Sequence, residues 1–364
     1  MSMFSAFDHA CMQRALRLAE RGLYTTQPNP RVGCVIALDG EVVGEGAHLR
    51  AGQPHAEVFA LRQAGDRAKG ATAYVTLEPC AHHGRTPPCA DALVAAKLKR
   101  VVVAAQDPFH AVDGRGIERL RAAGVEIEIG LMADAARELN VGFYCRVQRQ
   151  RPFIRLKLAS SLDGRIALAN GSSRWVTGMA ARADVQHWRA RSSAILSSAR
   201  TVELDDPQLT VRLEQDLQPP LRVIVCHRRL PPLNARLFHD GLAPVLLAAP
   251  AELLAAVDPP CETLGLPCST DGIELPILMQ ALAERGVNEL HTECGGVLAA
   301  NLLRAELVDE LLWYQAPRLL GGDSRPALGA LGLDRLDAAA SWQLLDCRQL
   351  GADLRLRLRR QQAT

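Results

Sequence analysis

Segments typical of helices and of strands alternate along the first 150 residues, and this alternation restricts the chain to an α/β architecture. Apolar residues at helical spacing predict an opening helix over residues 8–20, capped by Asp8. A hairpin is expected next, with strands at 32–38 and 41–46 joined by the turn Asp39-Gly40. Helices and strands then alternate, beginning with a helix, at 55–64, 73–77, 90–99, 100–105, 116–123, 125–129 and 133–140.

A short polar stretch at residues 149–152 marks the expected boundary between two domains, at 1–150 and 151–364. Strand and helix patterns alternate again after it, so the second domain is also expected to be α/β. Near the C-terminus, leucine and arginine alternate from Leu354 to Arg360. A period of two is typical of a half-buried strand with a solvated face, so we do not interpret these arginines as a stripe that binds nucleic acid.

The composition is that of an ordinary globular protein, with 48% apolar and 23% charged residues in a chain of 364. The formal charge of +2 comes from scattered lysines and arginines, which disfavours nucleic acid as a partner. No apolar stretch is long enough to span a membrane, and the first 20 residues are too polar for a signal peptide, so we expect a cytoplasmic protein. The ten cysteines lack short regular spacing, which predicts no disulfides, two metal ligands and eight small buried hydrophobic residues.

One histidine, two cysteines and a glutamate stand in a pattern that can build a hydrolytic zinc centre: His55, Cys80, Cys89 and Glu57. An imidazole and two thiolates supply three ligands and leave the fourth tetrahedral position of zinc to a water molecule. Zinc lowers the pKa of that water to about 7, but hydrolysis also needs a group that carries protons to the leaving group. Glu57 is placed for that role, because two residues along a helix it points about 200° away from His55.

The spacing of the two cysteines differs from the general pattern of zinc deaminases that act on nucleobases. That pattern has two residues between the cysteines, whereas eight separate Cys80 from Cys89, so the segment 81–88 must loop out and return to the metal. Such a loop would lie beside the substrate. An alternative is a structural zinc site closed by His82 or His83, in which Glu57 would have no purpose.

These residues lie within longer motifs that extend through both halves of the chain. The motifs are TQPNPRVG at 26–33, HAE at 55–57, EPCAHHGRTPPC at 78–89, KLASSLDGR at 157–165, SRW at 173–175 and TVELDDPQLTVR at 201–212. Together they resemble the family of bacterial bifunctional riboflavin-biosynthesis deaminase/reductases over nearly the whole chain. The loop between the cysteines distinguishes this family from cytidine deaminases and tRNA adenosine deaminases, which share the zinc chemistry.

The resemblance implies a fold class and two activities. The first domain would be a three-layer, cytidine-deaminase-like domain and the second a dihydrofolate-reductase-like domain. The first would use zinc to hydrolyse the exocyclic amine of 2,5-diamino-6-ribosylamino-4(3H)-pyrimidinone 5′-phosphate, and the second would use NADPH to reduce the ribosyl group to ribityl. The partner implied is this small pyrimidine ribosylamine phosphate, and a homo-oligomer is compatible with the resemblance.

Matching positions imply further contacts in both domains. In the first, Asn29 and His48 would contact the pyrimidine or ribose, and His82, Arg85 and Asp107 would surround the sugar or phosphate. The implied NADPH contacts are Ala159, Trp175, Thr201, Asp205, Gly295, Gly296, Val297, Leu298, Ala299, Ala300 and Asn301. The implied substrate contacts in the second domain are Lys157, Ser173, Arg189, Leu209, Arg212 and Glu293.

Elementary chemistry supports some of these positions. The guanidinium forks of Arg189 and Arg212 suit a phosphate, while Lys157 and Glu293 can hold sugar hydroxyls. Gly295-Gly296, between an expected strand and helix, could let backbone amides approach a diphosphate. Two glycines after a strand are also typical of a plain tight turn, and no G-x-G-x-x-G motif indicates a Rossmann domain.

Three positions depart from the family pattern. Cys226-His227 replaces an Asp-Ser pair, Phe109 replaces an Asn, and Cys294-Gly295-Gly296 replaces a Gly- or Ala-Gly-Pro run. The first change leaves the choice between NADPH and NADH open. Two alternatives therefore stay open as well: a deaminase whose second domain only binds substrate, and a nucleotide-binding regulator with a structural zinc.

Overall fold

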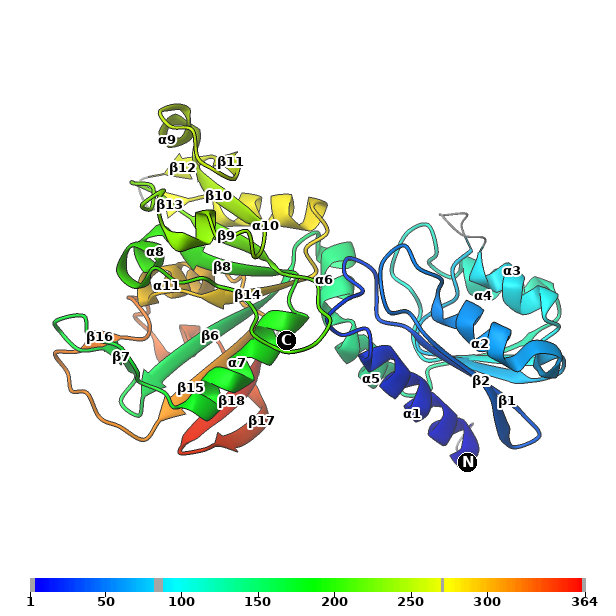
Figure 1. Cartoon of the computed structure of the whole chain (residues 1–364). Helices are drawn as coiled ribbons and strands as arrows, with labels where there is room; N and C mark the ends of the chain where they lie inside the picture. Colours follow the sequence, from blue (N-terminus) through cyan, green and yellow to red (C-terminus); the bar gives the residue numbers. More distant parts are fainter. Residues whose placement is uncertain (1–3, 82–87, 270–271, 362–364) are drawn as a thin grey trace. The chain divides into compact units, whose positions relative to one another are not determined.

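The computed structural model of the chain describes residues 4–81, 88–269 and 272–361. The chain divides into two compact units, Met1–Arg149 and Gln150–Thr364, called here the first and second units (Figure 1). The division falls one residue before the boundary expected from the sequence. Among the described residues, every helix is too short or too polar to cross a membrane.

The first unit is a sheet between helical layers. Its elements are α1 (Ala6–Glu20), β1 (Gly33–Leu38), β2 (Glu41–Ala47), α2 (Ala56–Ala64), η1 (Gly65–Ala68), β3 (Thr72–Val75), α3 (Cys89–Ala95), β4 (Arg100–Val103), α4 (Arg115–Ala122), β5 (Glu126–Ile129), α5 (Ala133–Leu139) and α6 (Val141–Arg149). The strands lie in the order β2-β1-β3-β4-β5. β1 is antiparallel to both of its neighbours, whereas β3, β4 and β5 are parallel.

Successive strand residues point to opposite faces of this sheet and so supply two cores. Ile36 and Val103 pack on the face covered by α2, α3 and α4. Val35 and Val102, their neighbours in sequence, pack on the face covered by α1 and α5 (Figure 1). The three-layer α/β arrangement expected for the first domain is therefore confirmed.

The first helix begins earlier than its apolar pattern indicates. Ser5 is the N-cap, and its hydroxyl accepts a hydrogen bond from the Asp8 N–H at 3.1 Å while the Asp8 carboxylate accepts one from the Ser5 N–H at 2.8 Å. The prediction that Asp8 caps the helix was therefore wrong, because this reciprocal capping box places Asp8 inside the first turn. The Asp8 carboxylate also accepts hydrogen bonds from Tyr74 and Arg100, which ties α1 to β3 and β4.

The second unit is built on a longer, mostly parallel sheet. Its elements are β6 (Phe153–Ser161), β7 (Arg165–Ala167), α7 (Met179–Arg191), β8 (Ala194–Ser198), α8 (Ala199–Asp205), β9 (Leu221–Val225), η2 (Arg236–Phe238), β10 (Val245–Pro250), α9 (Ala251–Ala255), β11 (Glu262–Leu266), β12 (Cys268–Ser269), β13 (Gly272–Ile273), α10 (Leu275–Glu284), β14 (Glu289–Glu293), α11 (Gly296–Arg304), β15 (Glu310–Ala316), β16 (Arg325–Pro326), η3 (Leu336–Ala338), β17 (Trp342–Leu350) and β18 (Asp353–Arg360). The large sheet has the order β11-β10-β9-β8-β14-β6-β15-β18-β17. Its strands are parallel from β11 to β15, and β18 and β17 are added antiparallel.

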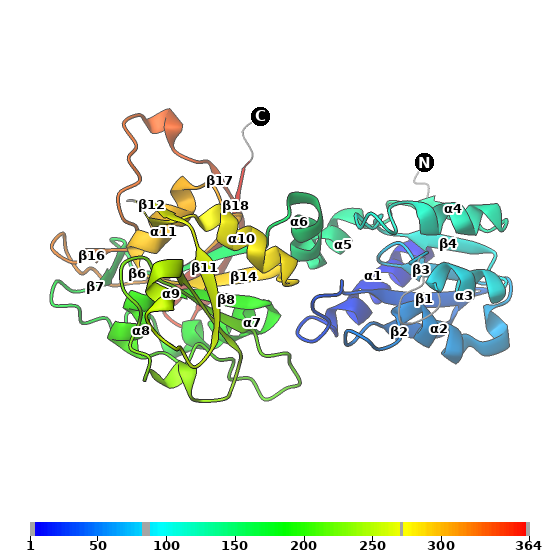
Figure 2. The same ribbon diagram turned by 90° about the horizontal axis from the view of Figure 1, so that it is seen from above.

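Helices cover both faces of the large sheet. α10 and α11 lie on one face and α7 and α8 on the other (Figure 2). From β6 the strand order proceeds outward through β8, β9, β10 and β11, and then returns to β14, which lies between β8 and β6. Open parallel sheets bind ligands beyond the carboxyl ends of strands where the order reverses. A crevice is therefore expected at the carboxyl ends of β6, β14 and β8.

The arginines of β18 do not form the solvated face that its sequence pattern suggests. Arg355 is 4% exposed and contacts Asp184 of α7, whereas Leu354 is 40% exposed. Arg357 and Arg359 pair with Glu310 of β15 at 2.9 and 2.7 Å. The expectation of a solvated arginine face was therefore wrong for Arg355, whose charge is compensated by carboxylates inside the unit, whereas Arg357 and Arg359 are half-buried and Leu358 packs against the core.

The cysteines also differ from expectation in their exposure. Cys268 and Cys347 are exposed, so the prediction that eight cysteines are buried was wrong for these two. Cys268 lies in the short strand β12 and Cys347 in the edge strand β17, where few neighbours cover a side chain. None of the ten cysteines, all of which are among the described residues, forms a disulfide.

Glu310 lies at the centre of the buried charge cluster beneath β18. Besides Arg357 and Arg359, it pairs with Arg155 of β6 at 2.8 Å, and the side chains of Glu310 and Arg155 are both fully buried. Burial acts to raise the pKa of Glu310, but the guanidinium groups outweigh burial and lower it to about 2.

Replacing Glu310 with Gln should destabilise the second unit by about 3–5 kcal/mol at pH 7, because buried guanidinium groups lose their counter-charge. A carboxylate whose folded pKa is lowered stabilises the fold fully above its ordinary pKa, and loses this effect as pH falls through the folded value. The difference between Glu310→Gln and wild type should therefore shrink between about pH 5 and pH 2.

Denaturant unfolding followed by tryptophan fluorescence measures this effect selectively, since Trp175, Trp188, Trp313 and Trp342 all lie in the second unit. Glu306→Gln removes an exposed partner of Arg360 and is the control, with an expected change below about 1 kcal/mol. Equal decreases in the free energy of unfolding of the two variants would show that the buried charge cluster contributes no more to stability than an exposed ion pair.

Candidate functional site

Three potential metal ligands converge at the N-terminal ends of α2 and α3. His55 is the N-cap of α2, Cys80 follows β3, and Cys89 is the first residue of α3. Their ligand atoms all lie within 4.8 Å of one another. His55 Nδ1 is 3.2 Å from Cys89 Sγ and 3.6 Å from Cys80 Sγ.

Gly46 of β2 allows α2 to reach this position. A Cβ on Gly46 would lie 1.9 Å from the carbonyl oxygen of Ala56, so only glycine lets the first turn of α2 lie against the strand. The hairpin predicted from Asp39-Gly40 therefore does more than add the edge strand β2 to the sheet. It provides the surface on which His55 and Glu57 are placed.

The donor set and its spacing fit a zinc ion. Zn–N bonds of about 2.0 Å and Zn–S bonds of about 2.3 Å in a tetrahedron separate neighbouring ligand atoms by about 3.5 Å, close to the distances found between His55 and the cysteines. The hydrogen bond between the two thiols lowers the pKa of Cys80 and raises the pKa of Cys89, so Cys80 is the one of the pair that more readily becomes a thiolate. Within the described ranges, no other trio of His, Cys, Asp or Glu side chains is arranged to share a metal.

Glu57, in the first turn of α2, is a buried carboxylate with 3% exposure. Its Oε2 atom has no hydrogen-bond partner in the part of the chain that the structure describes. Burial raises the pKa of Glu57 to about 7. Because an unsatisfied buried polar group destabilises a fold, the position of Glu57 is better explained by chemistry than by stability.

Two of the substrate contacts implied by the sequence lie next to the metal-type cluster. Asn29 Nδ2 is 3.1 Å from His48 Nε2, and the His48 ring packs edge-on against the His55 ring at 5.2 Å. Asp107 is buried after β4, and burial raises its pKa to about 7. His82 and Arg85 lie outside the described residues.

Glu78 belongs to this site, although the sequence analysis gave it no role. Its two carboxylate oxygens accept hydrogen bonds of 2.9–3.3 Å from the backbone N–H groups of Asp107, Gly114, Gly116 and Ile117. This anchors the start of α4 beside Pro79-Cys80, where a Cβ on Gly116 would lie 1.9 Å from the Pro79 carbonyl oxygen. In the sequence, the glutamate directly before Pro79-Cys80 could have indicated a role at the site. No local pattern predicts that its carboxylate accepts a hydrogen bond from Gly116.

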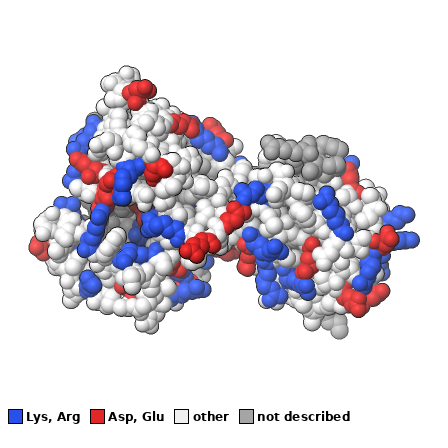
Figure 3. Space-filling model, in the orientation of Figure 1, with Lys and Arg blue, Asp and Glu red and all other residues white. Residues whose placement is uncertain are grey.

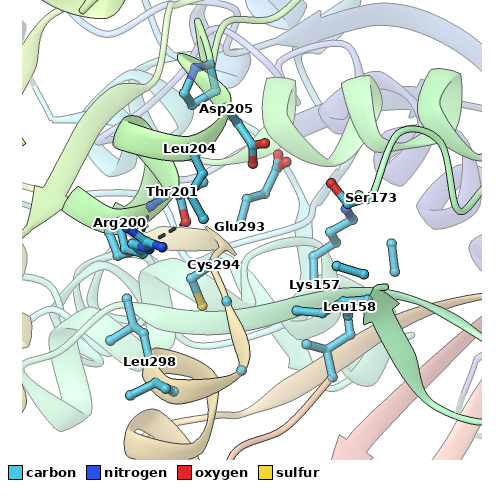
Figure 4. Close-up of a pocket in the computed structure, with 18 of the residues that line it drawn as sticks. Lys157, Leu158, Ser173, Arg200, Thr201, Leu204, Asp205, Glu293, Cys294 and Leu298 are labelled. Atoms are coloured by element: carbon cyan, nitrogen blue, oxygen red, sulfur yellow. Dashed lines mark hydrogen bonds between the residues drawn. The ribbon is translucent and has the colours of Figure 1, made fainter. Parts of the chain in front are cut away.

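A cleft of about 1340 Å³ opens in the second unit at the carboxyl ends of β6, β8, β9 and β14. Pockets for one small ligand measure about 300–1,000 Å³, so this cleft has room for two ligands side by side. On the face shown in Figure 3, lysine and arginine side chains gather around a hollow in this unit. In Figure 4, Lys157 and Glu293 extend into the same space, with Thr201 and Asp205 across from Lys157.

Most residues that the sequence analysis assigned to the second site line this cleft. They are Lys157, Ala159, Ser173, Trp175, Arg189, Thr201, Asp205, Leu209, Arg212, Glu293, Gly295, Gly296, Val297, Leu298 and Asn301. Ala299 and Ala300 do not line it, and are 0% and 2% exposed on the inward side of α11. Cleft residues without an earlier role include Arg200, Arg228 and Arg229.

A buried charge cluster lies on one wall of the cleft. Arg189 of α7 donates two hydrogen bonds to Glu293, at 2.5 and 2.9 Å, and a third to the Thr210 carbonyl oxygen at 2.8 Å. Burial acts to raise the pKa of Glu293, but Arg189 and His291 hold it well below its ordinary value. His291, given no role from the sequence, is fully buried with Nε2 3.3 Å from Glu293 Oε1.

Lys157 of β6 is the register partner of Glu293 on the neighbouring strand β14. Burial lowers the pKa of Lys157. It is the only lysine between residues 150 and 364, where every other basic chain is arginine or histidine. Burial shifts the pKa of a lysine amine much more readily than that of a guanidinium group.

The start of α11 fits a diphosphate. Gly295 is the N-cap of this helix, and no described atom lies within 4 Å of where its Cβ would stand. A Cβ on Gly296 would be 3.0 Å from the Pro326 carbonyl oxygen, a tight contact that favours glycine there. Backbone N–H groups at the N-terminus of a helix attract anions, and this end of α11 opens into the cleft.

Comparison with known proteins finds a match for each unit and for the chain as a whole. Residues 5–105 match the cytidine and deoxycytidylate deaminase zinc-binding region, and residues 152–356 match the RibD C-terminal domain. The chain is 47% identical over 364 residues to the riboflavin biosynthesis protein RibD of Escherichia coli strain K12, covering 96% of this chain and 99% of the relative. The chain belongs to the RibD family. It is thus a bifunctional enzyme of riboflavin biosynthesis, with a deaminase in the first unit and a reductase in the second, as the sequence motifs predicted.

Solved RibD structures agree with this assignment over the whole chain. Acinetobacter baumannii RibD, form 1, matches with a TM-score of 0.91 and 46% identity, covering 98% of this chain and 99% of that one. A Thermotoga maritima protein described as a diaminohydroxyphosphoribosylaminopyrimidine deaminase/5-amino-6-(5-phosphoribosylamino)uracil reductase matches with a TM-score of 0.87 and 32% identity, covering 97% and 99%.

Replacing Glu78 with Gln should weaken zinc binding by the first unit about 10- to 100-fold, because the segment that carries Cys80 loses its anchor. The carboxylate of Glu78 accepts hydrogen bonds with two oxygens, whereas a glutamine amide has only one. Its NH₂ group would face backbone N–H groups that also need an acceptor. Competition with a chromogenic chelator measures the affinity, and Glu118→Gln, at an exposed position of α4, is the control. Wild-type affinity in Glu78→Gln would show that Glu78 does not position Cys80.

Proposed function

We propose that the first unit removes the exocyclic amine of 2,5-diamino-6-ribosylamino-4(3H)-pyrimidinone 5′-phosphate, and that the second unit reduces the ribosyl group to ribityl with NADPH. Glu57 carries this proposal, as a buried carboxylate oxygen without a described partner beside a set of zinc-type ligands. The description of the Thermotoga maritima relative supports the substrate class.

In the first unit, His55, Cys80 and Cys89 would hold zinc, which when bound lowers the pKa of its water to about 7. Glu57 takes a proton from the attacking water and delivers it to the departing amine, so that a C–O bond replaces the C–N bond and ammonia leaves. A pKa of about 7 suits transfer in both directions. A structural zinc site does not need a carboxylate that transfers protons. The position of Glu57 therefore argues against the alternative of a nucleotide-binding regulator with a structural zinc.

The remaining residues of the first site would orient the substrate. Asn29 and His48 lie close enough to His55 to contact the pyrimidine or its ribose. Asp107 follows β4, at the same sheet edge as the Cys80 segment, and would contact the sugar. His82 and Arg85 stay proposed contacts of the sugar or phosphate on the family pattern alone.

In the second unit, Lys157 and Glu293 would hold the sugar, with Ser173 and Leu209 completing its surroundings. Three of the five N–H groups of Arg189 are donated to Glu293 and Thr210. Arg189 would thus hold Glu293 and still contact the substrate with its two remaining donors, beside Arg212, whose guanidinium group would bind the phosphate.

The cofactor proposed for the second unit is NADPH, which when bound supplies a hydride to C1′ of the opened ribose. Ala159, Trp175, Thr201 and Asp205 would contact it, the start of α11 at Gly295, Gly296, Val297 and Leu298 would receive its diphosphate, and Asn301 would contact it further along the helix. Lys157, with its lowered pKa, would deliver the proton that completes the reduction.

Replacing Glu57 with Gln should lower ammonia release about 100- to 10,000-fold with zinc content unchanged, since glutamine keeps the shape but cannot carry protons. Ammonia release from the diaminopyrimidinone substrate and the bound metal are measured on the same preparation. As a control, the variant should still reduce separately supplied deaminated product. Normal ammonia release would remove Glu57 from the mechanism and favour a structural zinc.

Replacing Lys157 with Met should lower NADPH oxidation at least about 100-fold while ammonia release continues, because methionine keeps the apolar stem but loses the proton donor. NADPH absorbance and ammonia are followed in parallel. Lys99→Met, at an exposed lysine of the first unit, is the matched control and should keep both activities. Full NADPH oxidation by Lys157→Met would contradict the proposed role.

A further inference from the structure

The segment that follows α8 crosses the edge of the cleft without regular secondary structure. Residues 206–212 belong to no helix or strand, yet Leu209 and Thr210 are only 3% and 7% exposed. Buried backbone N–H and C=O groups need hydrogen-bond partners, which a helix or a strand would normally supply. In this segment, side chains of neighbouring elements supply partners instead.

Two buried arginines hold backbone carbonyl groups of this segment. Arg222 of β9 donates a hydrogen bond to the Gln208 carbonyl oxygen at 3.0 Å, and Arg189 of α7 donates one to the Thr210 carbonyl oxygen at 2.8 Å. Each arginine is also held by a carboxylate, since Arg222 pairs with Asp240 and Arg189 with Glu293. Both anchors are therefore fixed by the body of the second unit.

A third anchor is uncharged. Gln186, one turn before Arg189 on α7, accepts a hydrogen bond from the Arg212 backbone N–H at 3.0 Å. The Gln186 side chain is 6% exposed. Its replacement would release the backbone of Arg212 without leaving a buried charge unpaired, unlike the replacement of either arginine anchor.

Leu209, between these anchors, has a strained backbone. Its φ of 53° lies in the left-handed region, which residues with large side chains rarely adopt. Such strain persists only where the surroundings impose it, and its cost is comparable with the net contribution of one or two hydrogen bonds. Loss of a single anchor should therefore be enough to let the turn at Leu209 relax.

This inference rests on the proposed function, in which Arg212 binds the phosphate of the pyrimidine substrate. We propose that Gln186 is a positioning residue of the reductase, which places the Arg212 guanidinium group by holding its backbone next to the Leu209 turn. The Arg212 side chain is exposed in the cleft, so its reach depends on where its backbone is held. Guanidinium forks bind phosphate in a fixed geometry, and a displaced backbone would lose that geometry.

Steady-state reduction of the deaminated product by the whole chain tests this role, and the same compound without its 5′-phosphate is the comparison substrate. Gln186→Met keeps a similar volume but removes the acceptor. It should raise KM for the phosphorylated compound about 10-fold, while kcat and KM for NADPH change less than about 2-fold. KM for the unphosphorylated compound should not change. Gln280→Met, at an exposed glutamine of α10, is the matched control.

A double-mutant cycle with Arg212→Met separates positioning from a general structural role. Arg212→Met should itself raise KM for the phosphorylated compound, and in that background Gln186→Met should add less than about 2-fold. Gln186→Asn, whose shorter amide withdraws the same acceptor, carries the test if Gln186→Met does not fold. An unchanged KM in the Gln186 variant, or two effects that simply multiply, would overturn the positioning role and leave the reductase function in place.

Two other outcomes concern the proposed function itself. An unchanged KM in Arg212→Met would show that Arg212 does not bind the phosphate, and would overturn the role of Gln186 with it. Failure of wild type to reduce the deaminated product would overturn the proposed reduction together with the inference built on it.

Discussion

The free-energy cost of burying a carboxylate shapes both units of this enzyme. Glu78 is compensated by four backbone N–H groups, Glu310 by three guanidinium groups from the two strands β6 and β18, and Glu293 by Arg189. Each compensated carboxylate fixes a segment: the start of α4 beside Pro79-Cys80, the β15–β18 pair and the wall of the reductase cleft. Glu57 differs, because one of its buried oxygens has no partner in the described chain. In the proposed function, this is why Glu57 is the carboxylate available for proton transfer.

Both units place their chemistry at the carboxyl ends of parallel strands. In the first, the segments after β3 and β4 carry Cys80 and Asp107 to the same edge of the sheet. In the second, β6 and β14 present Lys157 and Glu293 in register, and α11 starts directly after β14. A rigid sheet therefore sets the distances between groups that the loops alone would leave variable, and the helices on each face only need to bring His55 or Arg189 to that edge.

Sequence patterns predicted those features that depend on neighbours along the chain. Periods of two and of 3.6 residues, Asp39-Gly40 and the motifs around His55 and Cys80 indicated the layers, the hairpin and the metal-type cluster. Features that depend on distant partners were missed or misjudged. The alternating pattern around Arg355 did not reveal its contact with Asp184, and the sequence around Glu78 did not reveal its contact with α4. Asp8 resembled a cap because it stands directly before the apolar helical pattern, whereas the helix begins one turn earlier, at Ser5. Likewise, the family resemblance implied Ala299 and Ala300 as NADPH contacts, although α11 turns both toward the core.

The central claim is that one chain carries out two consecutive reactions at two separate sites. The most direct measurement gives purified, zinc-loaded protein the diaminopyrimidinone ribosylamine phosphate and records ammonia release and NADPH oxidation separately in the same sample. The account predicts that ammonia appears first and that NADPH oxidation follows only after deaminated product has formed. Oxidation without prior ammonia release, or the absence of both signals, would contradict it.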